Sequence, residues 1–308
     1  MSIELTIFTP SYNRAHTLHR VYESLQVQTL QNFEWIIIDD GSIDNTEDVV
    51  KDIINKSKFP IIYIKQENSG KQAAWNKAVS LAKGEYFCCL DSDDSIYSSV
   101  GLERVFKNYI HYLHQDKVIG LRFLAFSNVK NDFHGSKLSD DIIICSWFDD
   151  FSNSKNFGER LDILKTKDLK NFLYPVKEGV KFIPEIWFYI KVSNAGFKFA
   201  YIPEPLRLFF DDASDNRLSR SSIKKHAIGH YIARSTMLHD IPTWVYIKNI
   251  IAWVKTFIRF SQCANILGVS FKKRLKDTNL LYALSSYLLF FMSLGGLCCI
   301  NKFHPHTC

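Results

Sequence analysis

The stretch that decides the fold is Tyr86-Phe87-Cys88-Cys89-Leu90-Asp91-Ser92-Asp93-Asp94. Its first five residues form a continuous apolar run, typical of a buried strand in a parallel sheet. Three carboxylates then follow in four positions, at the carboxyl end of this expected strand. In open α/β sheets, ligands bind at the carboxyl ends of the strands. Carboxylates this close repel one another unless a cation lies between them. Their hard oxygens suit Mg²⁺ or Mn²⁺, although Asp is also common in plain acidic loops and helix caps.

Around this stretch, the first hundred residues alternate between strand and helix periodicity. We expect strands over 5–9, 33–38, 61–64 and 86–90, and helices over 14–27, 45–55 and 71–82. This alternation predicts an α/β fold with a mostly parallel sheet flanked by helices. A second acidic pair, Asp39-Asp40, ends the strand over 33–38. Because parallel strands end at one edge, we expect both acidic groups to face one ligand, and a nucleoside diphosphate with its metal suits such a site.

Two other nucleotide-binding classes lack support in the sequence. The first strand is not followed by the Gly-x-Gly-x-x-Gly pattern of dinucleotide-binding folds, and the P-loop pattern Gly-x-x-x-x-Gly-Lys-Ser/Thr is absent. The acidic strand ends therefore remain the principal signal for a ligand site.

Four motifs, in this order and at these spacings, resemble those of family 2 glycosyltransferases of the GT-A fold, of the type that builds bacterial surface polysaccharides. The resemblance is close over 3–100 and weak up to about residue 220. It implies a GT-A type, Rossmann-like sheet. The motifs are Thr9-Pro10-Ser11-Tyr12-Asn13-Arg14, Ile38-Asp39-Asp40-Gly41-Ser42, Asn68-Ser69-Gly70-Lys71 and Leu90-Asp91-Ser92-Asp93-Asp94.

The resemblance implies that the first three motifs hold the nucleotide base. Pro10 and Tyr12 would lie against the base, and Tyr12 would stack on it, an interaction of about 1–3 kcal/mol. Asp40 would accept a hydrogen bond from the N3–H of uracil, with Asp39 as the neighbouring alternative. Lys71 would lie near the base or the phosphates. Tyr12 packed under the sheet and a solvated Lys71 are the alternative interpretations.

The same resemblance implies that the fourth motif holds the ribose and the metal. Asp91 and Ser92 would bind the donor nucleotide, with Asp91 at the ribose. Asp93, together with Asp91 and Asp94, would coordinate the Mn²⁺ or Mg²⁺ that bridges the diphosphate.

A general base is the next requirement, because an inverting transfer must remove the proton of the acceptor hydroxyl. The enzymes that this chain resembles often carry a Glu-Asp pair after the metal motif, and this chain has none there. The nearest match is Pro184-Glu185, which is typical of a helix start. We therefore expect Glu185 to be the base and Glu178 to be the second candidate; the alternative is that Glu185 only caps a helix. Asp149-Asp150 and Asp211-Asp212 are more distant candidates.

The remaining residues up to 220 are less regular. We expect a helix over 102–113, a strand over 118–126, loops over 127–160 and strands ending at Pro203 and Phe210. The polar segment 211–222 contains Arg217 and Arg220, and we expect a loop that closes over the diphosphate; an ordinary surface loop has the same composition.

Charge divides the chain unevenly. The net charge is +6, but residues from Arg217 onward have 13 Lys/Arg against 2 Asp/Glu, a net +11, and the remainder has 25 against 30, a net −5. We expect a catalytic domain over 1–220, with a nucleotide-binding half (1–100) and an acceptor half (101–220), and a basic, apolar helical region over 221–308. Seven cysteines without a Cys-x-x-Cys pair indicate reduced thiols.

The C-terminal region has the pattern of a membrane-associating segment. A helix expected over 241–260 carries Lys248, Lys255 and Arg259 on one face and tryptophans and aliphatic residues around the rest, which suits a membrane interface rather than nucleic acid. The basic cluster 272–276 precedes an uncharged run over 278–301 that is long enough to cross a bilayer. A spanning helix, an interfacial hairpin and an oligomer-forming helix all fit this run.

These expectations combine into one function. The chain is expected to be a metal-dependent, inverting glycosyltransferase that moves a sugar from a UDP-linked donor to a hydroxyl of a glycan or lipid-linked glycan. No apolar signal precedes the first strand, so the catalytic part is expected at the cytoplasmic face of the inner membrane. Two alternatives remain: an enzyme of the same fold that glycosylates a polyprenyl phosphate, and a non-catalytic assembly partner that binds a nucleotide sugar.

Overall fold

The computed structural model describes the main chain of residues 3–138, 140–211 and 222–294. The chain packs into two compact units. Two segments of the expected 1–220 domain, 147–157 and 177–195, group with the C-terminal helices rather than with the sheet. The first unit comprises Met1–Ser146, Gly158–Val176 and Gly196–Ala213, and the second comprises Trp147–Phe157, Lys177–Ala195 and Ser214–Cys308.

A single mixed sheet forms the centre of the first unit. Its first four strands are parallel, and the strands beyond them run in both directions. In spatial order they are β3 (Ile61–Lys65), β2 (Phe33–Asp39), β1 (Leu5–Ser11), β4 (Tyr86–Cys89), β9 (Arg160–Lys165), β6 (Val118–Ser127), β10 (Lys198–Phe209) and β5 (Ser95–Ile96), with β7 (Asp132–Phe133) on β6 and β8 (Ile143–Cys145) on β10. The predicted strands of the first hundred residues are confirmed, and the mostly parallel sheet is corrected to a mixed one.

The central antiparallel strand is β9, which the sequence did not predict. It runs antiparallel between β4 and β6, directly after a polar stretch that we expected to form loops. Leu161 and Ile163 are buried in it, and Asp162 forms an ion pair with Arg122 of β6 at 3.3 Å. Charged residues inside a central strand hide the apolar pattern on which local prediction depends.

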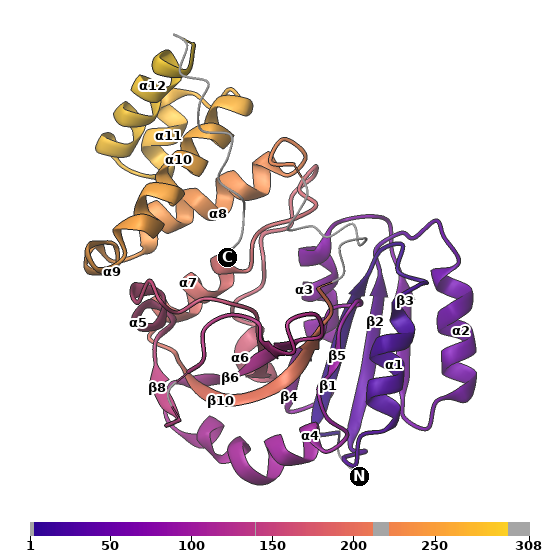
Figure 1. The fold of residues 1–308 in the computed structure, drawn as a ribbon. Coiled ribbons are helices and arrows are strands. Elements are labelled where there is room, and N and C mark those ends of the chain that lie inside the picture. Colours follow the sequence, from indigo (N-terminus) through magenta and orange to yellow (C-terminus); the bar gives the residue numbers. More distant parts are fainter. Residues whose placement is uncertain (1–2, 139, 212–221, 295–308) are drawn as a thin grey trace. The chain divides into compact units, whose positions relative to one another are not determined.

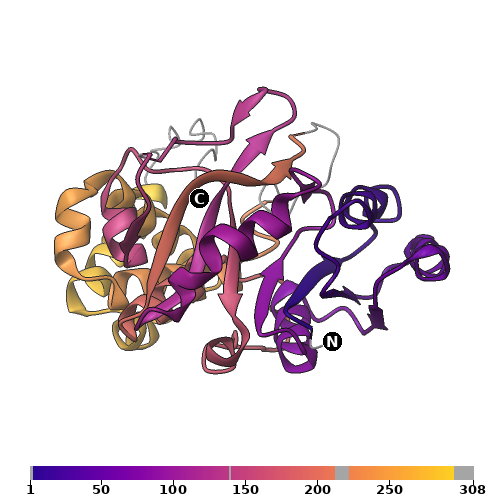
Figure 2. The same cartoon turned by 90° about the horizontal axis from the view of Figure 1, so that it is seen from below.

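Helices cover both faces of the parallel half of the sheet (Figures 1 and 2). α1 (Leu18–Gln26) and α2 (Thr46–Lys56) pack on one face, and α1 buries four apolar residues at helical spacing there. α3 (Lys71–Leu81) packs on the other face, where Trp75 meets Phe8 of β1 edge-to-face at 6.2 Å. The expected helix over 102–113 is present in three parts: α4 (Gly101–Arg104), a π-helical turn η1 (Val105–Tyr109) and a 3₁₀ segment η2 (Ile110–His114). The short α6 (Thr166–Leu169) follows β9.

The second unit is helical. Tyr231, Phe260 and Cys263 lie in its core, and the buried Arg274 bonds Val269 O, Ser286 Oγ and Asn265 Oδ1 at 2.8–3.0 Å. Arg274 therefore holds the fold together rather than forming part of an exposed basic cluster. The helices are α5 (Trp147–Ser152), α7 (Ile186–Asn194), α8 (Ala227–Asp240), α9 (Thr243–Lys248), α10 (Ile250–Ile266), α11 (Phe271–Asp277) and α12 (Leu280–Leu294).

The expected helix over 241–260 is broken at Asn249. The side chain of Asn249 accepts a hydrogen bond from Ala252 N and caps α10, and its amide nitrogen donates to Phe151 O at 2.8 Å. Within the described ranges, no helix is both long enough and apolar enough to cross a membrane. The end of the expected run over 278–301 lies outside the described residues.

Candidate active site

The loops that follow β1 and β2 are tied together at the carboxyl edge of the sheet. Asn13 donates from its backbone N to Ser42 Oγ at 2.8 Å, and its side-chain oxygen accepts from Ile43 N at 2.9 Å. Asn13 has a φ of +54°, and α1 begins only at Leu18, later than predicted, because residues 12–17 form this connection. Tyr12 is 48% exposed, so its ring is accessible at this edge, and Pro10 is the second-to-last residue of β1.

The neighbouring acids Asp39 and Asp40 have different environments. Asp39 is fully buried and accepts from Ser42 N at 2.8 Å and from the hydroxyl of Tyr63 at 2.7 Å. Burial, and then the hydrogen bond to Asp39, raise the pKa of Tyr63, so Tyr63 stays a neutral donor. Asp39 therefore stabilises the turn and contacts β3.

Asp40 holds the loop that leads into α3. Its Oδ1 accepts from Gln66 Nε2 at 2.8 Å and from Ser69 N at 2.7 Å, and its Oδ2 accepts from Gly70 N at 2.8 Å. A carboxylate has about four lone-pair positions, so these three bonds leave one on Oδ2. Glycine at position 70 is required by its φ of +92°, which lets its N–H reach this carboxylate.

Lys71 connects this loop to the acidic motif after β4. As the first residue of α3, it places its Nζ 2.8 Å from Asp91 Oδ1. The other oxygen of Asp91 accepts from Arg207 of β10 at 3.2 Å. The second, third and fourth motifs therefore meet at one edge of the sheet, as the order of the parallel strands predicted.

Arg207 is the centre of a buried charge cluster. It donates from Nε to Asp94 Oδ2 at 2.6 Å and from its terminal nitrogens to Asp94, Asp91 and Glu159. Phe210 N donates to the other oxygen of Asp94 at 3.1 Å. Both oxygens of Asp94 are thus engaged, and its side chain is fully buried. Metal coordination by Asp94 stays a prediction, and its observed contacts give it a role in holding Arg207.

Burial and neighbouring charges shift the pKa values of this pair. The pKa of Asp94 is raised to about 7, mainly by burial and then by the charges of Asp93 and Asp91, against the opposing charge of Arg207. Burial lowers the pKa of Arg207, but the carboxylates around it outweigh this effect and raise it well above the ordinary value. Arg207 therefore stays charged and offsets part of the repulsion among the acids.

Asp93 and Ser92 are both buried in the same turn. Arg20 of α1 donates to the backbone oxygen of Asp93 at 3.3 Å, and its guanidinium lies 4.4 Å from the ring centre of Phe210. Sequence reasoning missed Arg20 and Arg207. The signal for Arg207 was a single cation in the otherwise apolar run Leu206–Phe210, where a buried charge needs a partner.

The residues at this edge fit a divalent cation. In the part of the chain that the structure describes, no three His, Cys, Asp or Glu side chains are arranged to hold a metal. Mg²⁺ at phosphate sites is usually held by one or two carboxylates and by the phosphates themselves. Asp91 and Asp93 supply these hard oxygens, and Asp91 is the more exposed of the two.

The candidate bases belong to the second unit. Glu185 is exposed and immediately precedes α7, with its backbone oxygen accepting from Phe188 N at 2.9 Å, so the predicted helix start is confirmed. Glu178 is exposed in the turn before it. The role of either residue as a base stays a prediction. Most of the arginine-containing loop predicted over 211–222 lies outside the described residues.

Curated relatives match the part of the chain that carries this edge. Glycosyltransferase GlyA of Streptococcus pneumoniae is 28% identical over 169 residues, which are 55% of this chain and 23% of that protein. The Escherichia coli UDP-Glc:alpha-D-GlcNAc-diphosphoundecaprenol beta-1,3-glucosyltransferase WfaP is 36% identical over 133 residues, 42% of this chain and 48% of that protein. The chain thus spans less than half the length of either relative.

Solved structures support the fold over nearly the whole chain. Staphylococcus aureus TarS in complex with UDP has a TM-score of 0.59 at 16% identity, covering 92% of this chain and 87% of that one. The mannosyltransferase PcManGT from Pyrobaculum calidifontis, in complex with GDP-Man and Mn²⁺, has a TM-score of 0.56 at 16% identity, covering 96% and 81%. The α/β fold is therefore of the GT-A type. The model of glycosyl transferase family 2 matches residues 6–177, more than half of the chain, and the protein belongs to this family.

Proposed function

We propose that this protein is an inverting glycosyltransferase that moves a sugar from a UDP-linked donor to a hydroxyl of a lipid-linked glycan in surface-polysaccharide synthesis. The observation that carries the proposal is the meeting of Lys71, Asp91 and Arg207 at the sheet edge that also presents Tyr12 and Asp40. Family 2 membership, and the UDP bound by TarS, support the donor class.

The proposed donor contacts use the polar and aromatic groups gathered at this edge. Tyr12 stacks on the base, and the remaining lone pair of Asp40 Oδ2 accepts from the N3–H of uracil. Pro10 lies against the base, and Ser92 and Asp91 face the ribose. Lys71 is a cation beside the position proposed for the diphosphate, where its charge favours the leaving nucleotide.

Asp91 and Asp93 are the proposed ligands of Mn²⁺ or Mg²⁺. A bound divalent cation supplies charge stabilisation to the leaving diphosphate. Lys71 and Arg207 form ion pairs with Asp91 and hold its oxygens at the end of β4.

Glu185 is the proposed base, with Glu178 as the second candidate. An exposed carboxylate at a helix start is accessible to an acceptor hydroxyl, whose proton a general base must remove. The hydroxyl then attacks the anomeric carbon from the face opposite the nucleotide, which inverts its configuration.

The acceptor is proposed to be at a membrane surface, at the cytoplasmic face of the inner membrane. The E. coli relative is named for a diphosphoundecaprenol-linked acceptor. The second unit exposes Trp244 and Ile247 on α9 and Ile251 and Val254 on α10, and its exposed Lys248 and Lys255 accompany them. Apolar side chains flanked by lysines suit an anionic lipid interface.

The test is a transfer assay with UDP-sugars, Mn²⁺ and two acceptors, a polyprenyl diphosphate-linked sugar and a polyprenyl phosphate. Transfer to the first acceptor, lost in Glu185→Gln and retained in the matched Glu23→Gln, is the expected result. A Glu185→Gln protein that glycosylates polyprenyl phosphate at the full rate would indicate the alternative enzyme, since a phosphate acceptor needs no base. Nucleotide-sugar binding without turnover on any acceptor would indicate an assembly partner.

A further inference from the structure

A pocket of about 380 Å³ lies at the opposite edge of the sheet from the acidic motif. It surrounds the amino end of β4, where Tyr86 begins the strand and pairs with Lys165 at the end of β9. Asp91 follows the other end of the four-residue β4. At about 3.3 Å per residue, the strand separates the two sites by roughly 13 Å.

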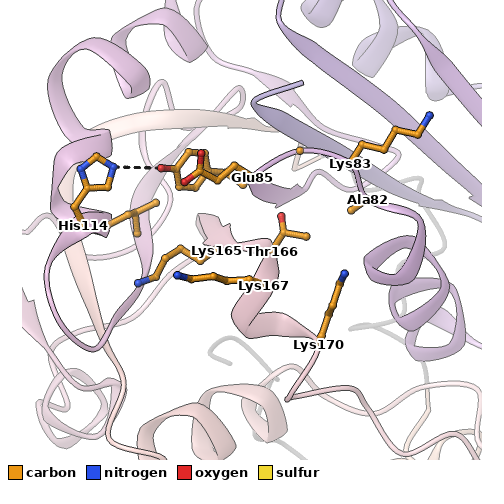
Figure 3. A pocket seen from close by; sticks show the side chains of 11 residues that line it. Ala82, Lys83, Glu85, His114, Lys165, Thr166, Lys167 and Lys170 are labelled. Carbon is orange, nitrogen blue, oxygen red and sulfur yellow. Dashed lines mark hydrogen bonds between the residues drawn. The ribbon is translucent and has the colours of Figure 1, made fainter. Parts of the chain in front are cut away.

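Most of the charge around this pocket is positive. Lys83, Lys165, Lys167 and Lys170 line it, against one acid, Glu85. Lys165 is paired with Asp168 at 3.7 Å, whereas Lys167 and Lys170 form no ion pair within the described residues. Figure 3 shows Lys165 and Lys167 extending toward the side of His114 and Lys170 rising on the other side of Thr166, while Lys83 points away. A concave surface of one charge concentrates counter-ions of the opposite charge.

A buried polar group in the pocket lacks a partner. Thr166 is 6% exposed, and its Oγ1 has no hydrogen-bond partner among the described residues, although its backbone N donates to Glu85 O at 3.0 Å. Buried hydroxyls are nearly always satisfied, so this hydroxyl is available to donate to a group in the pocket. Tyr86 adds a second hydroxyl, which lies 3.5 Å from His114 Nε2. A ligand with an acceptor oxygen would satisfy the Thr166 hydroxyl.

We propose that this pocket binds a phosphate group, in a site separate from the nucleotide-sugar edge. Lys167 and Lys170 neutralise its charge, and the Thr166 hydroxyl donates to one of its oxygens. The volume is that of a small-ligand site, so a phosphomonoester or diphosphate fits whole. The proposal does not depend on the function of the other edge, because no residue is common to both sites.

Calorimetric titration of the full chain with pyrophosphate, in EDTA and at low ionic strength, tests the site. Removing charge-assisted hydrogen bonds should weaken binding, so Lys167→Gln/Lys170→Gln is expected to lose about tenfold or more in affinity. The matched Lys51→Gln/Lys58→Gln, with the same charge change on another surface, should bind as wild type. Thr166→Val should lose severalfold and Thr166→Ser should retain the affinity.

Titration of the Lys71→Gln variant with pyrophosphate shows at which edge of the sheet pyrophosphate binds. Binding lost in Lys71→Gln but unchanged in Lys167→Gln/Lys170→Gln would assign it to the other edge and overturn the proposal. Co-sedimentation with phosphatidic acid vesicles identifies the source of the phosphate. If vesicle binding needs Lys167 and Lys170, the headgroup is a ligand; if only pyrophosphate binding needs them, the ligand is soluble. If neither depends on these lysines, the site does not exist.

Discussion

Arg207 and Asp94 form a buried ion pair that joins the penultimate strand of the sheet to the end of the acidic motif. The two partners are 113 positions apart in the sequence, and their side chains are 8% (Arg207) and 0% (Asp94) exposed. Arg207 also contacts Asp91, so this pair fixes the orientation of a carboxylate proposed to bind the donor. Its loss should affect both the stability of the fold and the acidic edge.

We predict strong coupling between these two residues. Arg207→Met or Asp94→Leu alone leaves an uncompensated buried charge and should lower the free energy of unfolding by about 3–5 kcal/mol. The double variant removes both charges and should be clearly more stable than the sum of the two losses implies. Urea unfolding of the four proteins measures this coupling. Additive losses would show that the pair does not act as a unit.

Tyr12 is predicted to contribute base stacking. Tyr12→Ala should weaken UDP binding by about 1–3 kcal/mol, because it removes the stacking surface of a ring that is 48% exposed. Tyr12→Phe keeps the aromatic face and should bind as wild type. Titration of each variant with UDP and Mn²⁺ provides the comparison, and equal affinity of the alanine variant would place the base elsewhere.

His230 gives the second unit a predicted sensitivity to acid. Burial, followed by the charges of Arg234, Arg259 and His226, lowers the pKa of His230 from 6.5 to about 4. As the pH decreases, His230 is protonated in the unfolded state at a higher pH than in the folded state. The contribution of His230 to stability is therefore complete above about pH 6.5 and is lost as the pH decreases toward 4. We expect a loss of about 1–2 kcal/mol over this window, discounted for partial exposure.

Thermal unfolding between pH 4 and 7 tests the prediction. His230→Gln should reduce the acid-induced decrease in midpoint, whereas His111→Gln, a substitution of an exposed histidine in the other unit, should not. An unchanged pH profile in His230→Gln would show that His230 does not cause the acid sensitivity.

The exposed apolar residues of α9 and α10 are predicted to bind lipid. Ile247 is 75% exposed and Ile251 is 59% exposed, so Ile247→Asp/Ile251→Asp should leave the fold intact while abolishing sedimentation with anionic vesicles. Ile43→Asp, at an 88% exposed isoleucine of the first unit, is the matched control. Equal sedimentation of the double variant and the control would show that this surface does not bind lipid.

Local sequence patterns were sufficient for the first hundred residues. β1 to β4 and α1 to α3 each carry a clear period, and their acidic ends meet as expected. The later elements depend on distant partners. β9 is stable because it fills the gap between β4 and β6, and α10 starts at Ile250 because Asn249 caps it and bonds Phe151 O.

The candidate site shows the same division. The motifs predicted which residues lie at the edge, but not that Asp94 is committed to Arg207 or that Asp39 is committed to Tyr63. Both commitments join residues that are far apart along the chain, and only the sheet order brings them together. Residue type and spacing alone do not distinguish a ligand-binding carboxylate from one that is already paired.

Metal-assisted binding of a nucleotide at the edge formed by Asp91 and Asp93 is open to a direct test. The thermal shift of the full chain is measured with UDP, with and without Mn²⁺, in wild type, Asp93→Ala and the matched Asp48→Ala on α2. A ligand at a hundred times its dissociation constant stabilises the native state by about 2.7 kcal/mol. We predict a manganese-dependent shift in wild type and Asp48→Ala that is absent in Asp93→Ala. An equal shift in Asp93→Ala, or none in wild type, would contradict the account.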